Sequence, residues 1–431
     1  MLLVELNEAN FELIQKYIYA DTERNKWPTI RKIINYEGVH TNSEPQYNLL
    51  EPWIQWVSVH TGLEFSDHKV FHLGDITNFD HKQVFEKIEN SGYTVGAVSP
   101  MNTQNLLRRP AFFIPDPWTQ TEPDNSKFSN LIHKVLVQVV NDNSKGKITL
   151  KSILVLLYAL VFKTTVSNWL SYARLAFKSR KNKWCKALFL DLLLSDIFKR
   201  SHKNTRPDFS VIFLNAFAHI QHHYFFNSKY YDGPLSNPDW YCDVKDDPFV
   251  DALDVYEKIL SNISKISKNE ELVIATGLRQ IPYSENTYYY RLRDHRVFLE
   301  QILDVEFKVY PRMTRDFSIK FTTANDASEA ANILAKITIN NTIIFGSIEQ
   351  KDTSLFVTLT HSEAIVKNTI MVVDEKLSVK ANDHLVFVAI KNGMHDQLGY
   401  VFSSKPGDFF KKLDGRHVCN LHDYFVSQFP K

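Results

Sequence analysis

The chain has 431 residues, of which 44% are hydrophobic, so it can bury one large core with insertions, and a disordered or fibrous protein is excluded. Its 50 Lys and Arg residues balance 49 Asp and Glu residues, which gives a formal net charge of +1. We therefore expect no binding to nucleic acid. Three widely spaced cysteines without a C-x-x-C motif fit neither a disulfide framework nor a thiolate zinc site, and we expect reduced, buried thiols.

The chain opens directly with an apolar segment at 2–6 that has the pattern of a buried strand. A strand at this position leaves no room for the basic, apolar and cleavage regions of a secretory signal. We therefore expect a cytoplasmic protein.

Five short apolar segments predict the core strands of the fold. None of them alternates strictly between polar and apolar residues, which is typical of strands buried on both faces, and longer helical patterns separate them. The predicted fold class is α/β, with a largely parallel central sheet and helices on both faces. The predicted strands are 2–6, 93–99, 209–214, 271–276 and 385–390.

Polar or small residues follow most of these strands. In open α/β sheets ligands bind beyond the carboxyl ends of the strands, so these residues predict where the functional site lies. They stand at 7–8, 100–102, 215–219, 277–280 and 392–395.

A basic segment at 145–206 interrupts this alternation, with 14 Lys or Arg residues against two acids, Asp191 and Asp196. Its apolar run at 153–162 is about half as long as a membrane span, so no transmembrane helix is expected. The segment predicts two or three helices, at 149–178 and 184–200. Their basic face either lies in solvent or makes peripheral contact with anionic lipid or a polyanionic carrier, which would make the protein membrane-associated.

A second interruption, at 312–380, predicts a small α+β unit inserted as a cap between two core strands. It has strand patterns at 317–321, 338–345, 354–359 and 365–373 and a helical pattern at 327–335. The predicted domain organisation is therefore a core in three pieces with two insertions. The core pieces are 1–120, 207–311 and 381–431, the basic helical insertion is 121–206, and the α+β cap is 312–380.

Five segments in chain order resemble the type I phosphodiesterase and nucleotide pyrophosphatase branch of the alkaline phosphatase superfamily. They are similar to its first strand and turn, its nucleophile-bearing helix, its Asp-x-x-x-His strand, its Ser-Asp-His strand and its final Gly-x-His segment. The segments are 3–11, 52–62, 209–222, 271–278 and 393–402. The resemblance implies an alkaline phosphatase-like fold and a site in which two metal ions activate a Thr or Ser oxygen and neutralise phosphoryl oxygens.

The residues at the implied metal positions depart from this family. The first aspartate falls on Asn7, the nucleophile on or beside Pro52, and an Asp-His pair on Gly277 and Leu278. None of these side chains supplies an anionic or imidazole ligand, and proline has no nucleophilic oxygen. The resemblance therefore implies a divergent member in which the usual two-metal chemistry is lost.

Half of the second metal site survives. The aspartate falls on Ala218, but His222 and His395 remain, and His219 shares one side of a predicted helix with His222. These three histidines predict a site for one divalent metal, zinc or manganese, with an open position. Because aromatic residues follow at 224–226, the alternative is that the histidines are packed and hydrogen-bonded.

The candidates for catalysis are Glu8, Glu51 and His219. Both glutamates should face the crevice if the resemblance holds, and the apolar wall of Trp53 and Trp56 should raise a carboxyl pKa toward the range useful for acid or base work. Two such carboxylates suit sugar chemistry. The alternative is that they are helix-terminal or surface charges.

Further polar side chains near the same strand ends are predicted to bind substrate. A guanidinium where a metal usually lies, at Arg279, matches the oxygens of a phosphate or sugar carboxylate. A solvated network of arginines and carboxylates is the alternative. The predicted substrate-binding residues are Asn7, Gln55, His60, Arg279 and Gln280.

Three functions remain open. The first is a hydrolase or transferase acting on a phosphorylated or carbohydrate substrate, in bacterial polysaccharide biosynthesis as the resemblance to uncharacterised relatives implies. The second is an inactive pseudoenzyme that serves as a binding or scaffold module of a glycan assembly system. The third is a metal-dependent phosphodiesterase whose ligands come from other positions. The sequence predicts no oligomeric state.

Overall fold

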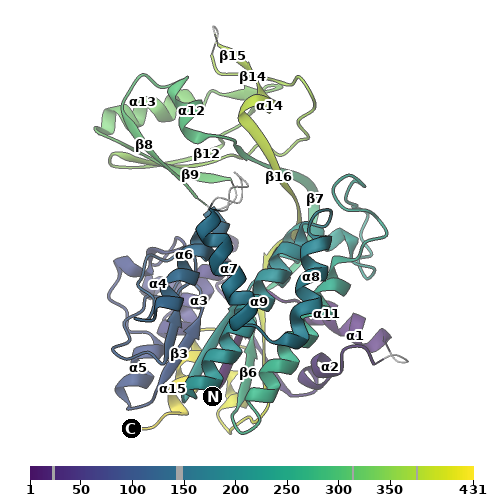
Figure 1. Cartoon of the computed structure of the whole chain (residues 1–431). Coiled ribbons are helices and arrows are strands. Elements are labelled where there is room, and N and C mark those ends of the chain that lie inside the picture. The colour runs from purple at the N-terminus through teal and green to yellow at the C-terminus, as the bar shows by residue number, and fades with distance from the viewer. Residues whose placement is uncertain (22–24, 142–148, 313–314, 375–376) are drawn as a thin grey trace. The chain divides into compact units, whose positions relative to one another are not determined.

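The computed structural model describes residues 1–21, 25–141, 149–312, 315–374 and 377–431, and the chain forms two compact units (Figure 1). Among the described residues, unit 1 comprises 1–140, 149–282 and 393–431, and the main segment of unit 2 is Tyr283–Asn392. The predicted cap at 312–380 lies inside unit 2, which extends beyond it on both sides.

An eight-stranded sheet forms the centre of unit 1, in the order β18-β2-β17-β6-β1-β5-β3-β4. Neighbouring strands from β6 to β4 pair in parallel, whereas β17 runs antiparallel to both β6 and β2. This mostly parallel sheet confirms the predicted α/β class. The strands are β1 (Leu2–Leu6), β2 (Glu37–Asn42), β3 (Val95–Val98), β4 (Phe112–Ile114), β5 (Phe209–Leu214), β6 (Leu272–Ala275), β17 (Leu398–Ser403) and β18 (Arg416–His417).

Strand β1 lies inside the sheet and is buried on both faces. Leu2, Val4 and Leu6 pack into one core cluster, and Leu3 packs into a second cluster on the opposite face, where the buried Glu5 contacts His60. Helices supply the other half of each cluster. The first face is covered by α1 (Phe11–Ala20), α2 (Pro28–Ile34), α6 (Lys127–Asn141), α9 (Trp184–Thr205), α10 (Ala216–Tyr224) and α11 (Pro248–Ile266). The second face is covered by α3 (Pro52–Thr61), α5 (Val84–Asn90) and α15 (Asn420–Ser427).

The predicted basic helical insertion consists of α6, α7 (Leu150–Phe162), the 3-10 helix η3 (Val166–Asn168), α8 (Trp169–Lys178) and α9. Residues 145–148 of the predicted basic segment lie outside the described residues. Within the described ranges no single helix is long and apolar enough to cross a membrane. Only Leu150–Phe162 together with Val166–Lys178 meets the length and composition of a span, and this pair is bent by 116°.

Short helices complete unit 1. They are η1 (Tyr47–Leu49), α4 (Phe65–His68), η2 (Asp75–Asn78), η4 (Phe225–Asn227) and η5 (Phe410–Leu413).

Unit 2 is built on two four-stranded sheets, ordered β11-β10-β14-β15 and β12-β13-β9-β8. Strands β7 (Arg279–Leu292) and β16 (Leu385–Asp396) pair with each other and carry the chain into and out of the unit. The other strands are β8 (Phe307–Pro311), β9 (Asp316–Phe321), β10 (Thr338–Ile339), β11 (Thr342–Ile343), β12 (Ser347–Lys351), β13 (Ser354–Thr358), β14 (Ile370–Val372) and β15 (Ser378–Lys380). The helices are α12 (His295–Glu300), α13 (Ala324–Leu334) and α14 (Ala381–His384).

The prediction of a central strand at 385–390 was wrong. This segment belongs to β16, which pairs with β7, and the last long strand of the central sheet is β17. Leu385 packs in the hydrophobic core of unit 2. The apolar run that begins there therefore belongs to a second core, separate from that of the central sheet.

Helix α5 carries a buried carboxyl group, that of Glu86, in its first turn. Burial raises the pKa of Glu86 from its ordinary value of 4.5 to about 7. The folded protein therefore holds a proton that the unfolded chain releases, so this group favours unfolding progressively as the pH rises from 4.5 to about 7.

Replacing Glu86 by glutamine should remove this pH dependence. In urea unfolding at about pH 5 and about pH 8, we expect the wild type to lose on the order of 2 kcal/mol more free energy of unfolding than Glu86→Gln. Asp408→Asn, which changes an exposed carboxylate, should behave as the wild type does. Equal pH dependence in the wild type and Glu86→Gln would contradict the assignment.

Candidate functional site

The carboxyl ends of β1, β5 and β6 meet at one edge of the central sheet. Asn7 and Glu8 follow β1, and their backbone N–H groups donate to the carbonyl oxygens of Leu214 and Thr276, at 3.0 and 3.1 Å. Because β17 is antiparallel, its starting end lies at the same edge and brings His395 there. Polar residues that were predicted to follow the strands thus lie together at this edge of the sheet.

Three side chains converge at this edge: Glu8, His222 and His395. The Oε2 atom of Glu8 lies 3.0 Å from Nε2 of His222 and 3.2 Å from Nε2 of His395. The two imidazole nitrogens are 3.3 Å apart. Ligands at about 2.0–2.1 Å from a tetrahedral ion are separated by roughly 3.3 Å, so these three atoms have the spacing of three corners of such a site.

The backbone of Glu8 is in the left-handed region, with a φ of 56°. Such a conformation costs a residue with a side chain about 1 kcal/mol or more, and it is held here by the surroundings. The Gln280 amide donates to Oε2 of Glu8, and the Asn7 amide donates to Oε1 at 2.8 Å. The carboxylate, which is 2% exposed, is therefore fixed in the direction of the two imidazoles.

The charge state of Glu8 is set by those imidazoles. Burial alone would raise the pKa of Glu8, but the charges of His222 and His395 and their hydrogen bonds outweigh burial and hold this pKa well below its ordinary value. The prediction of a raised pKa was therefore wrong for Glu8. The reason is that His222 and His395 lie 3.0 and 3.2 Å from the carboxylate oxygen, distances that the sequence did not predict.

Glu51 contacts the other side of the His395 ring. It stands at the N-cap of α3, before Pro52, and its Oε2 atom lies 3.7 Å from Nδ1 of His395. His395 therefore lies between two carboxylates, a buried one on Nε2 and a half-buried one on Nδ1. The cluster is open to solvent on the side of Glu51 and His222, whose side chains are 34% and 31% exposed.

His219, predicted as both a metal ligand and a catalytic residue, does not join this cluster of ligand atoms. Its ring packs 4.8 Å from the ring of His223, and burial lowers its pKa to about 4. His219 and His222 share one side of α10 but stand about 4.5 Å apart along the helix axis, and Glu8 reaches only the later one.

Two predicted substrate-binding residues belong to a separate buried region beside α3. His60 lies 2.6 Å from Oε1 of Glu5 and 2.9 Å from the hydroxyl of Thr103. Gln55 donates to the carbonyl oxygen of Leu49. Both side chains are fully buried, so the structure uses them to hold the helix.

Arg279 lies beside the cluster but is already neutralised. Its guanidinium is 2.7 Å from Asp396 and 2.7 Å from Glu12, and it donates to the Tyr400 hydroxyl at 2.9 Å. Two carboxylates on one guanidinium leave little net charge for a substrate anion. The other two predicted binding residues, Asn7 and Gln280, orient Glu8.

Gln221 is the residue that sequence reasoning missed. Its amide nitrogen donates to the carbonyl oxygen of Glu8 at 2.7 Å, and its Oε1 accepts from the N–H of Asn10 at 2.9 Å. It thereby ties the left-handed turn to α10, the helix that carries His222. The available signal was a glutamine on a side of the helix whose residues three or four positions away, Phe217, Ala218 and Tyr224, are apolar or aromatic.

A separate group of potential ligands consists of Glu64, His417 and Cys419. His417 lies 3.4 Å from Glu44, and burial raises the pKa of the Cys419 thiol to about 12. Glu64 in this group is exposed, whereas Glu8 in the first cluster is buried and held by hydrogen bonds from Asn7 and Gln280.

No family model matches the sequence, and no curated protein matches it. Solved structures are similar over nearly the whole chain. Phosphonoacetate hydrolase from Sinorhizobium meliloti 1021 is 10% identical with a TM-score of 0.40, and the match covers 99% of this chain and 95% of that one. Human ectonucleotide pyrophosphatase/phosphodiesterase 5 is 12% identical with a TM-score of 0.41 and coverages of 100% and 94%. Alkaline phosphatase from the Antarctic bacterium TAB5 is 9% identical with a TM-score of 0.39 and coverages of 99% and 96%.

With identities of 9 to 12% and TM-scores of 0.39 to 0.41, these similarities assign no family, activity, ligand or residue role to this chain.

Truncating the Gln221 side chain should lower the free energy of unfolding more than truncating that of His219. Gln221→Ala removes two hydrogen bonds in a buried turn, and we expect its free energy of unfolding to fall by about 1–3 kcal/mol in urea titrations. His219→Ala, on the same helix, leaves both bonds intact and should cost less. A loss for Gln221→Ala no greater than that of His219→Ala would refute the structural role.

Proposed function

We propose that the chain is a hydrolase or transferase that uses one divalent metal ion held by Glu8, His222 and His395. The observation that carries this proposal is the closed triangle of one carboxylate oxygen and two imidazole nitrogens, with sides of 3.0, 3.2 and 3.3 Å. Zinc and manganese both accept this mixture of ligands.

The two-metal arrangement implied by the resemblance does not fit these residues. The Asn7 side chain is taken up by Trp56, Asn215 and Glu8, and Pro52 opens α3 without a hydroxyl. Gly277 has a φ of 71°, and a Cβ atom there would lie 3.3 Å from Trp56. A single ion therefore fits where a pair does not.

The third function left open, a two-metal phosphodiesterase with relocated ligands, gains no support. Among the described residues, the other group of three potential ligands is the one around His417, and it shares no member with the Glu8 cluster. A two-metal site needs ions about 3.5–4 Å apart, which usually share or adjoin their ligands.

The ion, when bound, would supply Lewis-acid chemistry to an oxygen of the substrate. The residues of this chain would do the rest. Glu51 stands at the open side of the cluster, where it can accept or return a proton. It also contacts Nδ1 of His395, so it favours the ring orientation in which Nε2 faces the ligand position.

The proposed substrate class is phosphorylated or carbohydrate, and the proposed setting is bacterial polysaccharide biosynthesis in the cytoplasm. The resemblance of the five sequence segments supports this choice. The alternative function is that of a scaffold module in the same system, which would need neither a metal ion nor acid-base groups.

Metal content tests the site directly. Purified protein loaded with zinc or manganese and analysed by mass spectrometry should carry about one ion per chain. His222→Ala and His395→Ala should each weaken binding at least about tenfold, whereas His417→Ala, which changes the other group of potential ligands, should leave it unchanged. Equal binding by the wild type and His222→Ala would reject the site.

Glu51→Gln separates metal binding from catalysis. It should keep the ion and lower kcat by roughly 100-fold or more on whichever phosphate ester or glycoside the wild type cleaves, because general acid-base groups contribute about that much. A metal-loaded wild type that cleaves none of a panel of phosphomonoesters, phosphodiesters and glycosides would favour the scaffold module.

A further inference from the structure

Helices α7 and α8 expose large apolar side chains. Among the described residues, eleven of the twenty-five exposed large hydrophobic side chains lie between Leu150 and Phe177. The most exposed of them, Leu150, Leu170 and Phe177, are 73%, 86% and 71% exposed. Single exposed apolar residues are common on soluble proteins, but a concentration of this kind in two successive helices marks an interaction surface.

The two helices are apolar on both sides. Tyr172 and Leu175 are buried in the core of unit 1 and Leu156 packs against it, whereas Leu154 and Leu170 are exposed. In a surface helix of a soluble protein the apolar stripe normally faces the core. The outward face is therefore the one that needs a partner.

Specific polar contacts hold this orientation. The amide of Asn168, between the helices, donates to both carboxylate oxygens of Asp196 on α9, at 3.1 and 3.0 Å. The Tyr172 hydroxyl donates to the same carboxylate at 2.8 Å. Turning α8 to bury Leu170 would take the Tyr172 hydroxyl away from the buried Asp196 carboxylate, so the apolar exposure of α8 is built into the packing.

The charge of the segment identifies the partner. Residues 149–183 contain seven Lys or Arg residues and no Asp or Glu. Lys151, Arg174 and Lys183 are exposed beside the apolar side chains or at the end of the segment. Such a combination binds anionic bilayers, because apolar side chains enter the acyl boundary while cations meet the headgroups.

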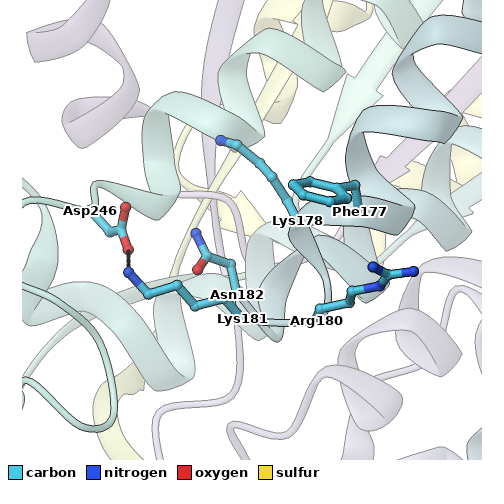
Figure 2. A pocket seen from close by; sticks show the side chains of 6 residues that line it. All are labelled: Phe177, Lys178, Arg180, Lys181, Asn182 and Asp246. Carbon is cyan, nitrogen blue, oxygen red and sulfur yellow. Dashed lines mark ion pairs between the residues drawn. The ribbon is translucent and has the colours of Figure 1, made fainter.

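The loop after α8 is anchored to the rest of unit 1 (Figure 2). Lys178 pairs with Asp251 at 2.7 Å, and Lys181 lies 3.8 and 4.0 Å from Asp243 and Asp246. Arg180 instead lies over the exposed ring of Phe177, 5.6 Å from its centre. An open pocket at this loop is lined by Phe177, Lys178, Arg180, Lys181, Asn182 and Asp246.

We propose that α7, η3 and α8 form a docking surface for an anionic lipid bilayer, on which the protein lies without crossing it. The bend of 116° between the helices suits a surface contact better than a span. Tyr158 and Trp169, both about half exposed, have the amphipathic rings that favour the membrane interface. This inference is independent of the metal site.

Sedimentation with vesicles tests the docking surface. The full chain should sediment with vesicles of phosphatidylcholine and phosphatidylglycerol and much less with phosphatidylcholine alone. Leu154→Glu, Leu157→Glu and Leu170→Glu combined should reduce the bound fraction at least about tenfold, because three apolar contacts are lost and three negative charges are added. Circular dichroism should show unchanged helix content.

The matched control is Val244→Glu, which adds a charge at an apolar side chain that is 79% exposed but lies outside the docking surface. It should bind vesicles as the wild type does. Bilayer-depth quenching by brominated lipid should also reach Trp169, and Trp169→Phe should remove that part of the quenching.

Two results would overturn the proposal. One is a wild type that stays in the supernatant with anionic vesicles. The other is equal binding by the wild type and the triple variant. The wild type could also fail to bind vesicles while light scattering shows that it is a dimer and the triple variant a monomer. In that case the surface binds a second copy of the chain, and the lipid proposal is wrong.

Discussion

The site depends on one backbone turn, the left-handed conformation of Glu8 at the end of β1. Strand β1 lies between β5 and β6, so the position of its last residue is fixed by hydrogen bonds on both sides. The turn then sends the Glu8 side chain toward His222 and His395, and Gln221 and Gln280 hold it there. Without this left-handed conformation, the Glu8 carboxylate would leave the two imidazoles. The backbone strain at Glu8 is therefore a condition for bringing the three side chains together.

The same turn places a carboxylate beside two histidines whose expected aspartate falls on Ala218. Asn7 stands where the resemblance implies an aspartate of the other metal site, and its amide connects Trp56, Asn215 and Glu8. Asn7 therefore holds the Glu8 carboxylate in place and is not a member of the cluster itself. A buried carboxylate between two imidazoles also keeps its charge, which suits a ligand better than a proton donor.

Much of the fold was predictable, because the strands of a doubly covered sheet are continuous apolar runs. The bounds of β1 and β5 match the predicted strands, and Glu8 follows β1 directly. Segment 385–390 has the same apolar character but belongs to unit 2, since composition cannot tell two cores apart. Glu8 was predicted as a catalytic residue and His222, His395 and His219 as metal ligands, whereas the structure brings Glu8 together with His222 and His395 and leaves His219 out. The roles of His219 and Gln221 depend on which turn of α10 faces Glu8, and the pKa of Glu8 depends on neighbours brought together by folding.

The connection between the two units has a consequence for how such proteins can diversify. Unit 2 begins three residues after Gln280 and ends three residues before His395, and the paired strands β7 and β16 keep its entrance and exit side by side. The two points at which the chain leaves and re-enters unit 1 therefore lie close together. Exchange, enlargement or loss of unit 2 in evolution would leave the positions of Glu8, His222 and His395 intact, because loop length between fixed ends has only a small entropic cost.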